Sequence, residues 1–259
     1  MPFISNTDEQ RQQMLKEIGV EKFSDLLVHI PSKFIQKHHI DMDEPLSELE
    51  LSRKVAKLAS KNIADANSFL GGGIYDHFIP AAVDHIILKP EFHTAYTPYQ
   101  AEVSQGTLQY IYEYQTLICE LTGMDISNAG MYDGATASAE AILMAVRKTK
   151  KNKAIIAGTL NPKYLAVIKA YTEGIGVKLE IIDNKDGVVD LEALKATVDN
   201  DTACVLVQTP NFLGNLEDMF AIEEITHSSK KALLIVAVDP ISLQLLNSPK
   251  EYKADIVLG

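Results

Sequence analysis

The feature that most constrains the fold is a regular alternation of short apolar runs and helix-like segments after Asn152. Cap-type residues mark the helix starts, as at Asn161–Pro162 and at Asp190. Apolar runs without a polar face are typical of strands buried on both sides, which form parallel sheets covered by helices. The sequence therefore predicts an α/β fold, a mainly parallel sheet with helices on both faces. The expected strands are residues 154–157, 177–182, 203–207, 233–238 and 255–258, and the expected helices are 161–173, 190–198 and 217–229.

Ligands of such sheets lie at the carboxyl ends of the strands, which makes three loops informative: those from Asp183, from Gln208 to Asp218, and from Asp239. An acidic residue after a buried strand, as Asp239 is, commonly pairs with a cation or a protonated ring nitrogen. In pyridoxal phosphate enzymes such a residue keeps the pyridinium protonated, so that the ring can accept electrons from a carbanion. The alternative interpretation is that Asp239 only begins a turn before Pro240.

A second candidate lies in the stretch MYDGATASAEAILMA, residues 131–145. A loop with Asp133 and Gly134 opens directly into a helix of small residues, and Ala135 and Thr136 belong to its first turn. The free amides of a first turn, together with the Thr136 hydroxyl, could cradle a phosphate. The alternative interpretation is that Asp133 is the N-cap of this helix and that its alanines serve only to pack it against the core.

A phosphate cradle at residues 133–136 and an acid at Asp239 would form the two ends of one cofactor site. The missing part is a lysine for the Schiff base, which we expect just after the strand that follows Asp239. That strand, residues 255–258, is the last of the sequence, and Lys250 and Lys253 come before it.

The rest of the chain predicts three regions. Residues 1–66 read as a helical N-terminal arm, with a cap at Thr7, an apolar face from Phe23 to Ile30 and a further helix over residues 46–66. Residues 67–106 have no sustained period and are rich in glycine, proline, histidine and tyrosine; long irregular segments are often functional. Residues 107–259 form the α/β domain.

Several classes of site are excluded by spacing. The glycines at 71–73 lack the flanking strand of a dinucleotide fingerprint and the following lysine of a P-loop. His77, His85 and His93 are spaced by eight residues, which is not a metal-ligand spacing, so we expect no metal site.

Charge and composition exclude further partners. A net charge of −11 leaves no excess of cations for phosphates, so we expect neither nucleic acid nor an anionic membrane surface as a partner. The longest apolar run is too short to span a bilayer, and the first residues do not resemble a signal peptide. Cys119 and Cys204 lie in apolar segments, typical of free buried thiols. These features predict a cytoplasmic protein.

Long blocks of the sequence resemble one known family. They are FLGGGIYDHFIPAAVDHII at 69–87, residues 92–141 with YTPYQAEVSQG at 96–106, QTPNFLGNLED at 208–218, and VDPISLQLL and ADIVLG near the end. These blocks are similar to the glycine cleavage system P-protein. They match the N-terminal half that some bacteria make separately, as subunit 1 of decarboxylating glycine dehydrogenase. The resemblance covers the whole chain, and family members run on past its last strand, so we expect a chain truncated at its C-terminus.

The resemblance implies a fold-type I pyridoxal phosphate-dependent transferase large domain in a heterotetramer of two subunit types. In this family glycine is decarboxylated through a pyridoxal phosphate Schiff base, and its aminomethyl group passes to the lipoyl arm of the H-protein. The Schiff-base lysine belongs to subunit 2. The cofactor is therefore expected in the partner, and the Asp133–Thr136 and Asp239 pocket is either a cofactor site or an inherited, empty one.

The resemblance also places residues near the active-site mouth: Tyr96, Thr97, Pro98, Tyr99, Gln100, Ser104 and Gln105, with His77 nearby. The tyrosine hydroxyls could position glycine's carboxylate or the lipoyl arm. Alternatively, the two tyrosines are buried anchors that hold the long loop against the subunit interface. Two other functions stay open, a non-catalytic structural subunit and an independent pyridoxal phosphate enzyme.

Overall fold

A computed structural model describes residues 5–35, 41–63, 66–67, 69–229 and 231–259. The chain divides into two units, residues 1–67 and residues 68–259, which are described separately. The domain boundaries expected at residues 66 and 106 stay predictions.

The first unit contains short helices: α1 (Asp8–Ile18), the 3₁₀ turns η1 (Phe23–Leu27) and η2 (Ser32–Phe34), and α2 (Glu48–Ala59). Thr7 caps α1 in a capping box with Gln10, and Ser47 caps α2 with Glu50. The predicted cap at Thr7 is therefore present, whereas α2 ends at Ala59, earlier than the expected residue 66; residues 64 and 65 of that expectation lie outside the described residues. None of the described residues in these helices is buried.

The second unit is organised by a parallel five-stranded sheet in the order β2-β1-β5-β6-β7. Its strands are β1 (Lys153–Ala157), β2 (Lys178–Ile182), β5 (Thr202–Thr209), β6 (Leu233–Val238) and β7 (Ile256–Leu258). All five predicted strands are thus present in a mainly parallel sheet. The predicted turn after β2 is a small antiparallel ladder of β3 (Asn184–Lys185) and β4 (Val188–Val189).

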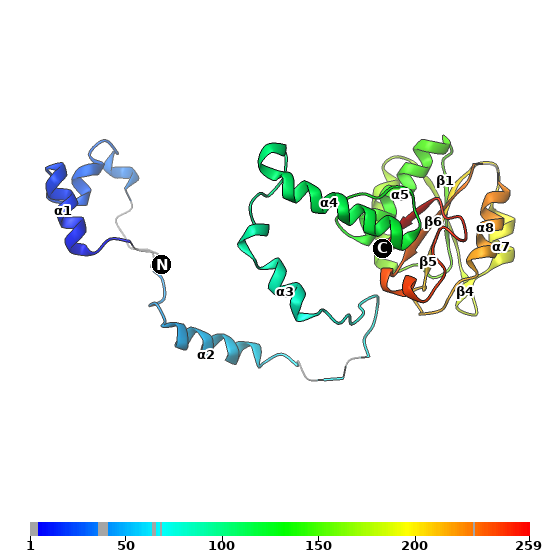
Figure 1. The fold of residues 1–259 in the computed structure, drawn as a ribbon, viewed down its shortest axis with the longest axis horizontal. Helices are drawn as coiled ribbons and strands as arrows, with labels where there is room; N and C mark the ends of the chain where they lie inside the picture. The colour runs from blue at the N-terminus through cyan, green and yellow to red at the C-terminus, as the bar shows by residue number, and fades with distance from the viewer. Residues whose placement is uncertain (1–4, 36–40, 64–65, 68, 230) are drawn as a thin grey trace. The chain divides into compact units, whose positions relative to one another are not determined.

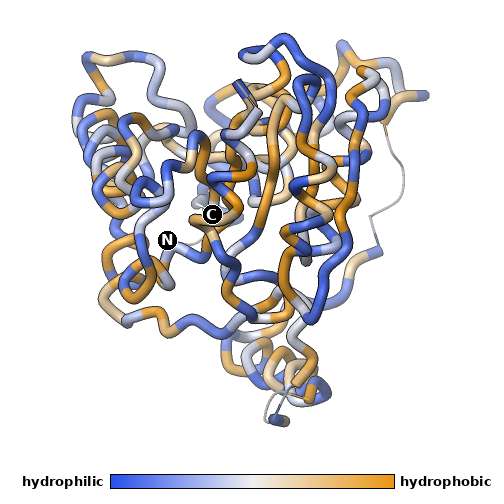
Figure 2. The backbone as a smooth tube through the Cα atoms, turned by 90° about the vertical axis from the view of Figure 1, so that its right-hand side faces the viewer, coloured by the Kyte–Doolittle hydropathy of each residue, from blue (hydrophilic) through white to orange (hydrophobic). Residues whose placement is uncertain are grey.

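Helices cover both faces of this sheet, as predicted (Figure 1). One apolar core lies under α5 (Gly134–Thr149) and α6 (Pro162–Glu173), and the other under α7 (Leu191–Thr197) and α8 (Met219–Ser228). The central strands are apolar between their polar ends (Figure 2), because both of their faces are buried. Cys204 of β5 is buried and Cys119 is half-buried, and both are free thiols.

The region before α5 contains more helix than expected. Within the segment expected to be irregular, α3 (Ala81–Ile87) and the 3₁₀ turn η3 (Pro90–Phe92) form, and α4 (Ala101–Thr122) begins inside it. The first residues of α4 show no helical spacing of apolar side chains in the sequence. The helix is irregular there, because the backbone is non-helical at Ser104, two residues before Gly106. At its other end α4 stops at Gly123, which has a φ of 75°.

Two buried polar side chains, Asn211 and Glu217, hold the loop after β5, and we call this pair the latch. Asn211 donates to the Glu217 carboxylate at 2.7 Å and to the Gly187 carbonyl at 2.8 Å. The other Glu217 oxygen accepts the Val189 amide at 2.8 Å, so one carboxylate joins the loop to β4. Glu217 is only 8% exposed, and its two bonds satisfy a group that would otherwise be costly to bury.

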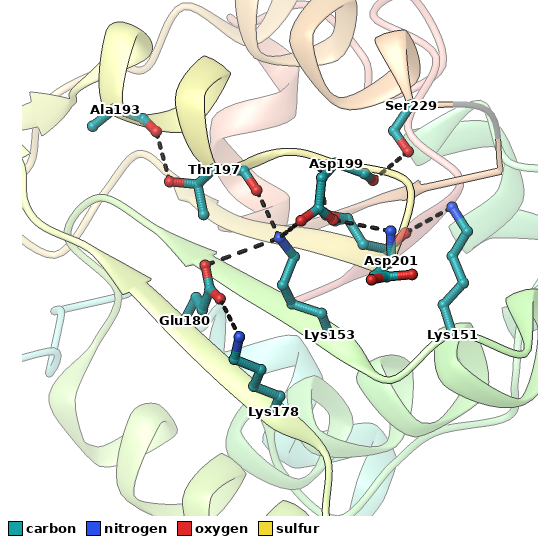
Figure 3. A network of polar contacts seen from close by, with 10 residues as sticks. Lys151, Lys153, Lys178, Glu180, Ala193, Thr197, Asp199, Asp201 and Ser229 are labelled. Atoms are coloured by element: carbon teal, nitrogen blue, oxygen red, sulfur yellow. Dashed lines mark hydrogen bonds and ion pairs between the residues drawn. The ribbon is translucent and has the colours of Figure 1, made fainter.

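The opposite, amino edge of the sheet is closed by a second polar cluster (Figure 3). Lys153, at the start of β1, lies 2.6 Å from a carboxylate oxygen of Asp199 and donates to the Thr197 carbonyl at 2.7 Å. Glu180 is further away, 4.0 Å from the Lys153 Nζ. The Lys153 side chain is 7% exposed, so these partners stabilise a nearly buried ammonium group. The hydrogen bond from Lys153 lowers the pKa of Asp199 to about 2.

We expect Asp199→Asn to destabilise the α/β unit by about 1 kcal/mol at neutral pH, since a neutral amide replaces a charged but solvent-screened partner of Lys153. The folded pKa of Asp199, about 2, lies below the ordinary 3.8. Its stabilising effect is therefore present above pH 4 and lost as the pH falls towards 2. Urea unfolding at several pH values measures this. Asp201→Asn, in the same turn, is the control; a difference for Asp199→Asn that persists undiminished at the lowest pH would contradict the assignment.

We expect Glu217→Gln to cost about 1–3 kcal/mol, because one of its two donor partners would then face an amide NH₂ group. The measurement is the free energy of unfolding in urea, compared with Glu224→Gln on the exposed side of α8. Equal stability of the two variants would show that the latch contributes nothing.

Candidate functional site

The carboxyl edge of the sheet gathers most of the candidate residues. Helix α5 ends a few residues before β1 begins, so its first turn must lie at the opposite edge, where the strands end. Asp239 directly follows β6 and therefore reaches the same edge. Helix α5 packs against β5 and β6, which keeps its first turn over the central strands.

Asp133 caps α5 in a closed capping box. Its carboxylate accepts the Thr136 amide at 2.7 Å and the Thr136 hydroxyl at 2.9 Å, and the Asp133 amide in turn donates to the Thr136 hydroxyl oxygen at 3.2 Å. These bonds, the one from the Thr136 amide first, lower the pKa of Asp133. The cap interpretation of this stretch is therefore what the structure shows.

Tyr164, from the first turns of α6, fills the space beside this cap. A Cβ placed on Gly134 would overlap the Tyr164 hydroxyl group, so only glycine lets the phenol approach the backbone there. Burial raises the pKa of Tyr164, and the charge of Asp133 and the nearby phenol of Tyr75 raise it further. Tyr164 therefore stays a neutral phenol beside an ionised carboxylate.

The segment around the glycine triplet reaches the same edge. His77 Nε2 lies 4.0 Å from a carboxylate oxygen of Asp239, and both side chains are partly exposed. Gly73, with a φ of 86°, lies so close to Asn161 and Phe212 that a Cβ would contact both side chains. Asp239 also caps the 3₁₀ turn η4 (Pro240–Gln244), because it accepts the Ile241 amide at 3.1 Å. The turn interpretation of Asp239 is therefore what the structure shows, and a pairing of Asp239 with a cofactor ring stays a prediction.

The phosphate end of this edge does not fit a phosphate group. The Thr136 amide and hydroxyl, which the sequence offers as donors, are already bonded to an anionic side chain of the chain itself. The Tyr164 hydroxyl occupies the space over Gly134.

The residues expected at an active-site mouth are not brought to this edge by the chain's described contacts. The amino-terminal end of α4, with the loop before it, is the end of that helix remote from the sheet (Figure 1). Tyr96 is fully exposed and Tyr99 is 92% exposed, whereas Ser104 is buried. Thr97, Gln100 and Gln105 are exposed and Pro98 is half-buried. Only His77 of this predicted group reaches the Asp133 and Asp239 edge.

Sequence reasoning missed the residues that line the edge from elsewhere: Tyr75, Asn161, Tyr164 and Phe212. For Tyr164 the sequence does hold a signal. Its place one turn into a helix that follows a buried strand is the signal that could have directed it to the carboxyl edge.

Neither a candidate metal site nor a helix that could span a membrane is present among the described residues. No group of three or more histidine, cysteine, aspartate or glutamate side chains among them could hold a metal ion. In the same part of the chain, none of the helices combines the length and the apolar character needed to cross a bilayer.

Comparison with known proteins gives a match over the full sequence. The family profile described as "Glycine cleavage system P-protein" matches residues 1–259. A protein of Carboxydothermus hydrogenoformans named "Probable glycine dehydrogenase (decarboxylating) subunit 1" is 49% identical over 261 residues, covering 100% of this chain and 59% of the relative. A protein of the same name from Geobacillus thermodenitrificans is 46% identical, and the match covers 99% of this chain and 58% of that relative. The chain thus spans somewhat over half the length of these curated relatives.

A solved structure agrees with the sequence match. A crystal structure titled as glycine decarboxylase (P-protein) of the glycine cleavage system, in inhibitor-bound form, superposes with a TM-score of 0.79 at 41% identity, covering 99% of this chain and 57% of that one. This confirms the predicted fold class, the large-domain fold of fold-type I pyridoxal phosphate enzymes. Since both the family profile and these relatives extend along its whole length, the chain belongs to the glycine cleavage system P-protein family.

Proposed function

We propose that this chain acts as subunit 1 of a two-subunit P-protein in the cytoplasm. The assembled enzyme would decarboxylate glycine and pass the aminomethyl group to the lipoyl arm of the H-protein, with pyridoxal phosphate and the reactive lysine held by subunit 2. Bound pyridoxal phosphate supplies the electron sink that stabilises the carbanion left by decarboxylation. This chain would bind the partner and complete the mouth of its active site.

The proposal is supported first by the relatives, which are named as subunit 1 along the whole of this chain. The name implies a second subunit. The corner at Asp133 supports the same division of labour, because a phosphate-bearing cofactor needs donors that are free to bind it. Here the Thr136 amide and hydroxyl are engaged by Asp133.

The observation that carries the role of this chain is the exposure of Tyr96 and Tyr99. These two tyrosines lie five and two residues before the start of α4, and each is almost fully exposed to solvent. They offer large apolar rings and hydroxyl groups to another surface. Tyrosine is enriched at protein interfaces because it combines these two properties. We place residues 96–105 at the mouth of the partner's site, where the hydroxyls would orient glycine's carboxylate or the lipoyl arm.

A second candidate, a purely structural subunit, is favoured by a different observation. In the first unit the apolar side chains of the helical arm are exposed, among them Phe23, Leu51 and Val55. Such an arm is suited to cover another chain, and this needs no residue in the reaction. A third candidate, an independent pyridoxal phosphate enzyme, requires the Asp133 corner to accept a phosphate.

Glycine–bicarbonate exchange separates these functions. We expect no exchange from this chain alone, little from subunit 2 alone, and full exchange when the two are combined in the presence of pyridoxal phosphate and H-protein. Size-exclusion chromatography of the same mixtures measures assembly. Exchange by this chain alone would establish the independent enzyme and overturn the proposal.

Removing single hydroxyls separates a contribution at the active-site mouth from a structural role. We expect Tyr96→Phe or Tyr99→Phe to lower the exchange rate of the assembled enzyme by about tenfold, the effect of one lost positioning hydrogen bond, with assembly unchanged. Tyr112→Phe, an exposed tyrosine on α4, is the matched control. Wild-type rates in both variants, with intact assembly, would leave only the structural role.

A further inference from the structure

The start of α5 is the place where the fold implies a phosphate and the chain supplies a different anion. Asp133 stands at the N-cap of a 16-residue helix, and its carboxylate accepts the Thr136 amide at 2.7 Å. The Thr136 hydroxyl turns back to the same oxygen at 2.9 Å and to the Asp133 carbonyl at 3.0 Å. The amide and the hydroxyl of Thr136 are thus both directed at Asp133.

The charge on Asp133 is held in place by these bonds. They lower the pKa of Asp133, so this carboxyl group is ionised throughout the neutral range. The N-terminus of a helix stabilises a nearby negative charge, and this effect falls off within about one turn. A phosphate brought to the same amides would face an anion at close range as well as the loss of two donors.

The space over Gly134, next to these donors, is taken by Tyr164. Its hydroxyl lies against Gly134, in the volume that a Cβ would take, and the half-buried ring keeps it there. The space that Gly134 leaves is thus filled by the phenol of Tyr164 and not by a ligand.

We propose that Asp133 is a built-in anion that takes the phosphate position of this fold and, with Tyr164, excludes phosphate-bearing ligands from the start of α5. Asp133 is then the residue that determines ligand specificity at this corner. The inference concerns this chain by itself and holds whether or not the chain assembles with a second subunit.

The test replaces the charge and keeps the cap. Serine is as good an N-cap as aspartate, so Asp133→Ser should preserve α5 while removing the carboxylate. We expect it to bind inorganic phosphate at least tenfold more tightly than the wild-type chain. The probe is inorganic phosphate, titrated at constant ionic strength, and the readout is the shift of the backbone amide signals of residues 134–136 in nuclear magnetic resonance. Urea unfolding checks that the variant is folded.

Two further variants make the result specific. Asp133→Asn also caps well and has nearly the volume of aspartate, so a gain in this variant isolates the charge from the space. Asp218→Ser makes the same change at the N-cap of α8, where Asp218 accepts the Ala221 amide at 3.1 Å: it removes the carboxylate and keeps a capping side chain. We expect Asp218→Ser to bind phosphate at residues 134–136 no better than wild type.

A second pair of probes tests which group is recognised. We expect Asp133→Ser to bind pyridoxal phosphate about tenfold more tightly than the wild-type chain does. We expect no such gain for pyridoxal, which lacks the phosphate. The proposal is overturned if the wild-type chain binds phosphate at residues 134–136 as tightly as Asp133→Ser. It is equally overturned if folded Asp133→Ser and Asp133→Asn show no gain, or if pyridoxal gains as much as pyridoxal phosphate.

Discussion

Burial of a parallel sheet on both faces is the constraint on which the α/β unit depends. The whole of β1 and nearly all of β5 are buried, because helices cover each side. Buried strands leave no room for charged side chains between the layers, so polar chemistry is confined to the two edges where strands begin and end. The polar side chains have a different role at each of these two edges.

The amino edge is closed and serves stability. Lys153 is nearly buried there and is matched by Asp199 and the Thr197 carbonyl. The carboxyl edge is open to loops and is shaped by the Asn211–Glu217 latch, which fixes the chain after β5. Because the latch holds this loop, Phe212 is kept at the position that Gly73 approaches.

At the carboxyl edge the chain's own groups stand at both ends of the site that the fold implies. His77 lies beside Asp239, and Asp133 with Tyr164 closes the start of α5. The polar groups of this edge are thus hydrogen-bonded or paired with other groups of the same chain. The exposed apolar and aromatic groups lie elsewhere, in the N-terminal arm and at Tyr96 and Tyr99, where another chain could cover them.

The sequence by itself determined the layers, the strands and the caps, since buried parallel strands read as unbroken apolar runs and capping is local in the chain. Asp133 and Thr136 are three residues apart, so their pairing was visible as one of two alternatives, and the family blocks predicted the fold type. Only the tertiary structure decided between cap and cradle, because the deciding neighbour, Tyr164, comes from a different helix. The His77–Asp239 contact joins residues from distant parts of the chain and leaves no periodic signal. The exposure of Tyr96 and Tyr99 likewise depends on what the folded chain leaves uncovered, which no local pattern records.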